Sequence, residues 1–344
     1  MILHTPGVKK TSDRELRQQL MELALGYWRS QVLFAATELG VFDALHAGGL
    51  TALALAKRWG RSYEHVLRLL NACAALGLLD KQGDCFTNTR LAQQFLVQTG
   101  PEFMGHWVQF MSTSYAPWGG LADTIRRGEP IQQEGHAQIG EGQDFTRDLI
   151  LAMHDYARGP GRLALSALDL PGRRRLLDVG GGPGTYSALL VRRNPELSAV
   201  VFDLPPVLEI TRELIDAAGL ADRVALQPGS YLVDELGAGY DVVLLSNMLH
   251  QEDPDTVLRL LRKAYAALTD GGQLVIQGAF LDAAETGPMW PVLQSLQLLL
   301  FYRGGRAYSI DETLAMASEA GFANPVARKP SLLSAESLVL ATKK

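Results

Sequence analysis

One segment of this 344-residue chain strongly limits its possible folds: an apolar stretch runs into a glycine-rich turn, L-L-D-V-G-G-G-P-G at 176–184, and a helical pattern follows. The apolar start predicts a buried strand. Glycines let the backbone bend sharply and come close to a ligand. The N–H groups at the start of the next helix then face a polar ligand. This order predicts a ligand-binding α/β domain.

Strand and helix patterns alternate after this turn, which predicts an α/β fold class with a Rossmann-like parallel sheet and helices on both faces. The predicted strands are Leu176–Gly180, Ala199–Leu204, Val224–Pro228, Asp241–Ser246 and Gln273–Gly278. The predicted helices are Thr185–Arg193, Pro206–Ala218, Pro254–Leu268 and Ile310–Ala320. Two apolar segments end the chain, Pro325–Arg328 and Ser337–Thr342.

The spacing of the glycines and the acid that follows them indicate the kind of ligand. The loop reads G-x-G-x-G, unlike the G-x-G-x-x-G favoured by dinucleotides, and Pro183 removes one N–H donor. That suits a ligand without a pyrophosphate. Asp178 can help to hold a cationic amine of the ligand. Asp203, at the end of the second strand, can accept both hydroxyls of a ribose, and Leu204 would pack on the base. A nicotinamide cofactor shares the loop and the ribose acid and stays an alternative.

The N-terminal part has a different pattern. Apolar residues at helical spacing cover Asp13–Ala47, and their number suggests that a second copy of the chain buries them. Ser62 and Gly77 bound a helix over Tyr63–Leu76. A short helix precedes it and a hairpin follows, the order of a winged helix. The predicted domains are a dimerisation domain at 1–100, linking helices that contribute to a substrate pocket at 101–171, and a catalytic domain at 172–344.

Composition argues against several partners. The net charge of −5 and pI of about 5.8 show no basic footprint for nucleic acid, and helix Tyr63–Leu76 offers few basic side chains for a DNA-binding regulator. Cys73 and Cys85 lack metal-ligand spacing and are expected to be buried, reduced thiols, with no metal site. No apolar stretch reaches the length of a membrane span, and Met1–Lys10 does not resemble a signal peptide. We expect a cytoplasmic protein without a membrane partner.

The chain resembles the small-molecule methyltransferases of the plant-type O-methyltransferase family, which use S-adenosylmethionine (SAM). The motifs that carry this resemblance are D-V-G-G-G-P-G at 178–184, F-D-L-P at 202–205 and D-G-G at 270–272. G-G-R-A-Y-S at 304–309 and A-G-F at 320–322 are similar to a bacterial branch. The resemblance implies a class I methyltransferase sheet with a C-terminal antiparallel strand, a winged-helix-like dimerisation domain and a homodimer.

The resemblance also implies a set of residues that bind SAM. Ser230 and Tyr231 would lie beside the adenine, although the family usually has Asp at the position of Ser230. Ser246, at the end of the fourth strand, falls near a further cofactor contact. The full predicted cofactor set is Asp178, Gly180, Gly182, Gly184, Asp203, Leu204, Gly229, Ser230, Tyr231 and Ser246.

His250 is the candidate general base. Methyl transfer is an in-line displacement at a sulfonium, and a phenol or enol acceptor must also lose its proton. His250 follows the fourth strand at the carboxyl edge, where open α/β sheets bind ligands, and by resemblance falls at the family's base position. The positions at which the family has carboxylates flanking this histidine are, however, occupied here by Gly278 and Ala307. Gln251 follows the histidine. Several alternatives therefore stay open: another partner for His250, an already ionised acceptor, N- or C-methylation, and a SAM-binding homologue with non-methylating chemistry.

Aromatic and sulfur-containing side chains recur on segments that we expect to face the acceptor. Pockets for flat ligands are mostly apolar with few polar groups, so a small, aromatic acceptor is predicted, with hydroxyl methylation preferred. The predicted substrate-binding residues are Trp107, Phe110, Met111, Met153, His154, Met289, Trp290, Gln294 and Tyr302.

Overall fold

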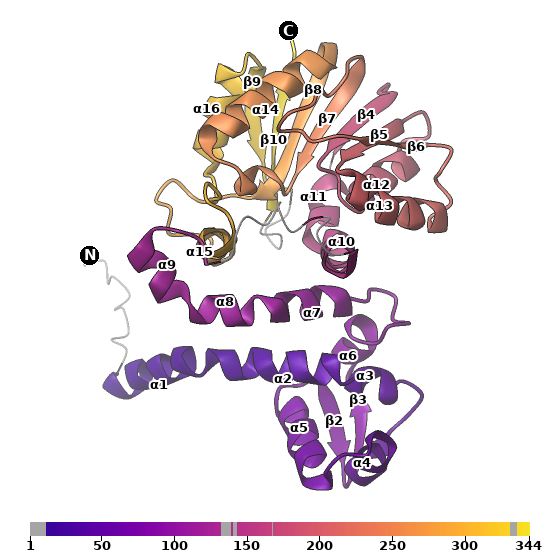
Figure 1. Ribbon diagram of the computed structural model, residues 1–344, viewed down its shortest axis with the longest axis vertical. Helices are drawn as coiled ribbons and strands as arrows, with labels where there is room; N and C mark the ends of the chain where they lie inside the picture. Colours follow the sequence, from indigo (N-terminus) through magenta and orange to yellow (C-terminus); the bar gives the residue numbers. More distant parts are fainter. Residues whose placement is uncertain (1–11, 132–138, 140–142, 167, 331–335) are drawn as a thin grey trace, which may run out of the picture. The chain divides into compact units, whose positions relative to one another are not determined.

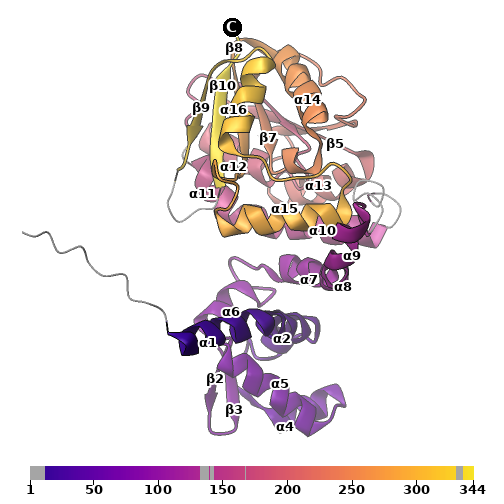
Figure 2. The ribbon, with the colours of Figure 1, turned by 90° about the vertical axis from the view of Figure 1, so that its left-hand side faces the viewer.

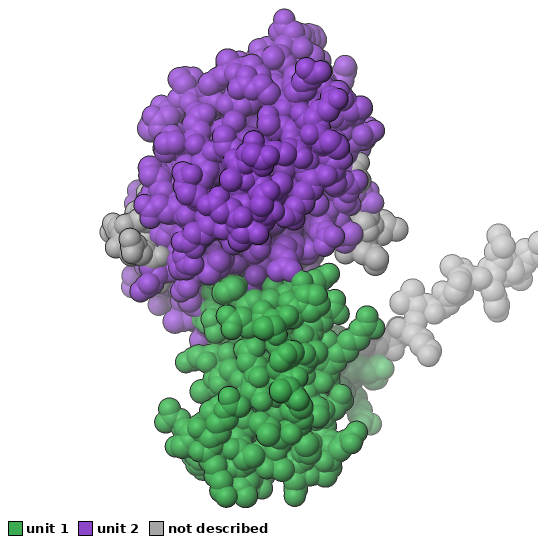
Figure 3. Space-filling model, turned by 90° about the vertical axis from the view of Figure 1, so that its right-hand side faces the viewer, with its two compact units in different colours: residues 1–112 green, residues 113–344 purple. Residues whose placement is uncertain are grey.

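The computed structural model describes residues 12–131, 139, 143–166, 168–330 and 336–344. The segment Met1–Lys10, considered above for a signal peptide, lies outside these residues. The chain divides into two compact units, residues 1–112 and residues 113–344 (Figure 3). No helix within the described ranges is both long and apolar enough to cross a membrane.

The first unit contains helices and a small antiparallel sheet of strand order β1-β3-β2. The predicted helical run Asp13–Ala47 is divided into three helices, and Gly40 takes a left-handed φ of 67° at the second break. Ser62 stands at the N-cap of α5 without a side-chain cap hydrogen bond. The elements are α1 (Asp13–Ala24), α2 (Gly26–Glu38), α3 (Val41–Ala44), β1 (Leu50–Thr51), α4 (Ala52–Trp59), α5 (Tyr63–Ala75), β2 (Leu79–Gln82), β3 (Cys85–Asn88), α6 (Arg90–Phe95) and α7 (Gly105–Thr113).

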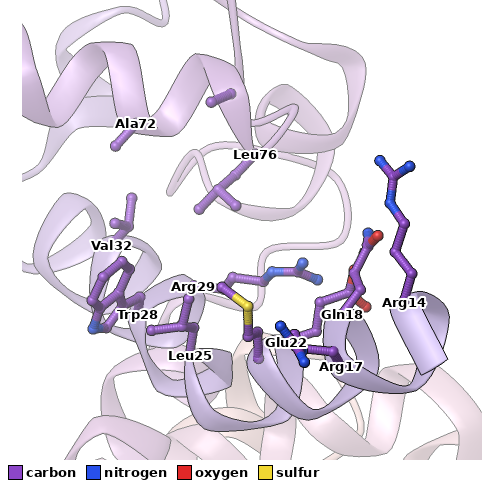
Figure 4. Close-up of a pocket in the computed structure, with 12 residues that line it drawn as sticks. Arg14, Arg17, Gln18, Glu22, Leu25, Trp28, Arg29, Val32, Ala72 and Leu76 are labelled. Carbon is purple, nitrogen blue, oxygen red and sulfur yellow. The ribbon is translucent and has the colours of Figure 1, made fainter.

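The core of the first unit leaves helix α1 outside it. Phe42, Leu55, Leu70 and Phe86 are fully buried, whereas no residue of α1 is buried. Cys73 is buried as predicted, but Cys85 is only half-buried. α1, α2 and the end of α5 line a groove of about 660 Å³, shown with its side chains in Figure 4.

The second unit is an α/β domain around a seven-stranded sheet of order β6-β5-β4-β7-β8-β10-β9 (Figure 1). β10 is antiparallel to both of its neighbours and is the one strand that runs against the others, which confirms the predicted sheet. Its elements are α8 (Tyr115–Gly119), α9 (Leu121–Arg127), α10 (Gln143–Tyr156), η1 (Ala157–Gly161), α11 (Arg162–Ser166), β4 (Arg175–Val179), α12 (Thr185–Arg193), β5 (Ser198–Asp203), α13 (Pro205–Ala217), β6 (Val224–Pro228), β7 (Tyr240–Ser246), η2 (Leu249–Gln251), α14 (Pro254–Ala267), β8 (Leu268–Ala279), α15 (Met289–Phe301), α16 (Ile310–Glu319), β9 (Ala323–Arg328) and β10 (Glu336–Thr342).

The two faces of this sheet carry separate apolar cores. α14 and α16 cover one face, and α11, α12 and α13 cover the other. Leu176, Leu244 and Val275 face α12. Because side chains of a strand alternate between the two faces, the residue two positions after each of them faces α12 as well. Those residues are Asp178, Ser246 and Gln277, and all three are polar and buried. The apolar α12 face therefore becomes polar at the carboxyl edge of the sheet, which α10 and α15 border in Figure 2.

Candidate active site

The glycine-rich loop after β4 is built on three left-handed residues. Gly180, Gly182 and Gly184 have φ values of 62°, 51° and 68°, a region that side chains with a Cβ rarely adopt. Asp203 ties this loop to the end of β5, since its Oδ2 accepts from the Gly182 N–H at 2.8 Å and its Oδ1 from the Leu204 N–H at 2.7 Å. The parallel pairing of β4 with β5 brings the loop and this acid together.

Asp178 lies directly beneath the loop and is fully buried. A Cβ placed on Gly181 would lie 2.8 Å from the Asp178 carboxyl carbon. Ser187 donates to Oδ2 at 2.7 Å, while Oδ1 is buried without a hydrogen-bond partner in the described part of the chain. Burial raises the pKa of Asp178 to about 7, against the opposing effect of the Ser187 bond. The orphaned Oδ1 and the open loop fit a polar, donor-bearing ligand.

The predicted adenine-side residues Gly229, Ser230 and Tyr231 directly follow β6. A Cβ on Gly229 would lie 2.5 Å from the Phe202 ring, so this position requires glycine. The Ser230 hydroxyl oxygen already accepts from the Leu232 N–H at 3.3 Å. The Tyr231 ring lies 3.7 Å from the position of a Cβ on Gly180, so this tyrosine flanks the loop.

A buried polar network that sequence reasoning missed lies at the carboxyl edges of β7 and β8. Ser246 donates to Gln277 Oε1 at 2.6 Å, and Gln277 Nε2 donates to Glu336 at the start of β10. Asn247, with a left-handed φ of 51°, donates to Glu336 at 3.3 Å, and Tyr156 also hydrogen bonds to it. Glu336 is fully buried, and burial raises its pKa. Its only sequence signal was a lone acid before an apolar strand.

Replacing Glu336 with alanine should destabilise the protein by about 3 kcal/mol or more, because several buried donors lose their acceptor at about 1–3 kcal/mol each. Glu336→Gln keeps an acceptor oxygen and should cost less than half as much. Urea unfolding of both variants tests this, with the exposed Glu319→Ala as the control. A loss below about 1 kcal/mol for Glu336→Ala would show that the donors find other acceptors.

His250 lies in η2, directly after β7. No hydrogen bond or ion pair to its ring occurs among the described residues, and burial lowers its pKa to about 4. It shares a cavity of about 20 Å³ with Asn247, Gly278 and Tyr308. Gly278 and Ala307 stand where the family has carboxylates. The backbone N–H of Ala307 donates to the Ser295 hydroxyl at 3.2 Å. Neither position supplies a carboxylate to the histidine.

The predicted substrate residues fall in both units. Trp107, Phe110 and Met111 lie on α7 of the first unit, where Trp107 packs against that unit's core. Met153 and His154 lie on α10, and His154 Nδ1 is 2.7 Å from the Thr185 hydroxyl at the start of α12.

The remaining predicted substrate residues lie on or directly after α15. Met289 is 76% exposed, Gln294 is partly buried, and Trp290 hydrogen bonds to Tyr156. Tyr302 follows the helix, and burial, together with the nearby Glu252 carboxylate, raises its pKa to about 12. α10 and α15 thus carry predicted substrate residues at the edge of the sheet where the loop and η2 lie (Figure 2).

Comparison with known proteins identifies the family. The O-methyltransferase domain model matches residues 118–323, and the O-methyltransferase dimerisation domain model matches residues 21–98. A 3-hydroxy-5-methyl-1-naphthoate 3-O-methyltransferase of Streptomyces sahachiroi is 34% identical over 88% of each chain. Mouse acetylserotonin O-methyltransferase is 33% identical over 92% of this chain and 86% of its own length.

A solved structure has the same fold over almost the whole chain. Human N-acetylserotonin methyltransferase in complex with SAM superposes with a TM-score of 0.87 at 27% identity, covering 98% of this chain and 99% of that one. These matches confirm the predicted enzyme class and SAM as the cofactor. The chain belongs to the O-methyltransferase family, whose members transfer a methyl group from SAM to small molecules.

Proposed function

We propose that this enzyme methylates a hydroxyl group on a small aromatic acceptor, with His250 as the general base. The observation that carries the proposal is the shared edge of the sheet. The loop tied to Asp203 and the unprotonated His250 follow neighbouring parallel strands, β4 and β7. A cofactor bound on the loop would therefore direct its methyl group toward an acceptor bound near His250.

Asp203 and Asp178 would hold the two polar ends of SAM. The Asp203 oxygens accept the Gly182 and Leu204 N–H groups, which fixes the carboxylate beside the loop, where it would accept the ribose hydroxyls. The buried Asp178 Oδ1 is available to a donor from the methionine amine. When bound, SAM supplies an electrophilic methyl group. Leu204, Ser246 and the loop glycines would complete the site.

The acceptor proposed is a fused aromatic ring with a free hydroxyl. The two relatives named above act, by their names, on a naphthoate and on acetylserotonin, which are both flat bicyclic compounds. Met153, Trp290 and Tyr302 would offer apolar surface to such a ring, with His154 and Gln294 as polar partners. In this proposal residues 1–100 serve dimerisation, 101–171 contribute to the pocket and 172–344 carry catalysis.

A panel of naphthols, hydroxyindoles and matched aromatic amines, with methyl-labelled SAM, tests this function. We expect label on the hydroxyl oxygen of at least one bicyclic phenol, located by mass spectrometry and NMR. Label only on nitrogen or carbon would overturn the choice of oxygen. Retained SAM binding with conversion of an acceptor but no methylated product would favour non-methylating chemistry instead.

We further propose that the exposed face of α1 is covered by a second copy of the chain. Leu16, Leu20 and Leu23 follow helical i, i+4, i+7 spacing and are 51%, 67% and 81% exposed. The dimerisation match starts within α1. Clustered apolar exposure of this kind marks a protein interface.

Introducing glutamate at both Leu20 and Leu23 should convert the dimer to a monomer, because two charges would be buried in an apolar contact. Light scattering coupled to size-exclusion chromatography measures the mass. Leu163→Glu, at a similarly exposed leucine of the second unit (50%), is the control and should remain dimeric. A dimer that survives the double change would place the interface elsewhere.

A further inference from the structure

Glu252 is a buried carboxylate where the sequence suggests only helix-start acids. Three acids, Glu252, Asp253 and Asp255, precede or begin α14. Asp253 is the N-cap, accepting from the Thr256 N–H at 2.9 Å, and Asp255 is exposed in the first turn. Glu252 instead is 8% exposed and accepts from the Tyr231 hydroxyl at 2.7 Å. Its side chain is therefore directed into the protein.

Glu252 lies next to the residues that would surround the nucleoside. Tyr231 connects them, because its ring flanks Gly180 of the glycine loop and its hydroxyl reaches Glu252. Burial and Glu252 raise the pKa of Tyr231, and Asp203 adds a smaller effect of the same sign. Both carboxyl groups thus affect the pKa of the Tyr231 hydroxyl. The resemblance implies that Tyr231 lies beside the adenine, so Glu252, which accepts from its hydroxyl, would lie close to the base.

We propose that Glu252 recognises the exocyclic amine of the adenine ring of SAM; this rests on the proposed cofactor site. That amine has two N–H donors, and an ionised carboxylate is their strongest side-chain acceptor. The Tyr231 hydroxyl donates to Glu252 Oε1 and so orients the carboxyl group. Ser230, at the position implied to contact this amine, already uses its hydroxyl oxygen as an acceptor for Leu232. Glu252 would supply the carboxyl group that the serine position lacks.

The test compares S-adenosylhomocysteine with S-inosylhomocysteine, in which a carbonyl oxygen replaces the 6-amine. The carboxylate should repel that oxygen, so the wild type should bind the adenosyl compound about tenfold or more tightly. Glu252→Gln can still accept from Tyr231 and can also donate to a carbonyl oxygen. We expect the preference to fall at least tenfold in this variant, measured by calorimetry as the ratio of the two Kd values. The exposed Asp255→Asn is the matched control and should keep the wild-type ratio.

The outcomes separate this inference from the function on which it rests. If the wild type binds S-adenosylhomocysteine but Glu252→Gln keeps the wild-type ratio, the role of Glu252 is overturned and the cofactor site stands. If the wild type binds neither compound, both proposals fall. Thermal unfolding of Glu252→Gln with and without S-adenosylhomocysteine confirms that the variant folds and still binds, so that a changed ratio reports recognition of the base.

Discussion

Replacing Asp203 with alanine should weaken binding of S-adenosylhomocysteine by about a hundredfold or more. Each hydrogen bond from a ribose hydroxyl to a carboxylate is worth about 1.5–3 kcal/mol, and two such bonds would be lost. The same substitution removes the acceptor of the Gly182 N–H and so loosens the glycine loop. Calorimetry gives the Kd directly.

Two further variants make this result specific. Asp203→Asn keeps one acceptor oxygen and should fall between alanine and wild type. Glu213→Ala removes an exposed carboxylate of the adjacent helix α13, which pairs with Arg147 at 2.8 Å, and should bind as the wild type does. An Asp203→Ala protein that binds within about threefold of wild type would show that the ribose is held elsewhere.

Replacing His250 with alanine should lower turnover of a neutral phenol by about a hundredfold or more, the usual contribution of a positioned base. The effect should shrink for an acidic phenol that is already ionised at the assay pH, because no proton then remains to be removed. Initial rates at saturating SAM, with both acceptors, measure the difference. The exposed His65→Ala of the first unit is the control. Equal turnover of the neutral phenol by wild type and variant would remove His250 as the base.

The pKa of His250 sets the pH dependence of this reaction. Burial lowers it to about 4, so the ring is unprotonated, and able to accept a proton, at every pH well above that value. Activity with a neutral phenol should therefore not decline between pH 8 and about pH 6, and the acid limb should appear only near the lowered pKa. A decline centred near 6.5, the ordinary value of an exposed histidine, would contradict a buried base.

Local sequence patterns predicted the parts of the candidate site that lie close together along the chain. The loop at 180–184 and Asp203 could be placed together because parallel strands joined by one helix end at the same edge of the sheet. His250 could be placed at that edge because it follows another predicted strand of the same parallel sheet. The polar partners of Glu336 could not be predicted, because the hydrogen bond from Asn247 to Glu336 joins residues 89 positions apart. It depends on β10 inserting between β8 and β9.

Local patterns indicated the α/β fold class and a ligand loop with a ribose acid, since strand periodicity, glycine spacing and the terminal acid are properties of short segments. The enzyme family and SAM followed from the resemblance of whole motifs to known methyltransferases. The packing of the folded chain set the environment of each side chain. Asp253 caps a helix, whereas its neighbour Glu252 lies in the interior. Burial lowers the pKa of His250, and segments far apart in the sequence meet in the hydrogen-bond network of Glu336. These outcomes depend on which distant segments pack around a residue, and burial and charge are set by that packing.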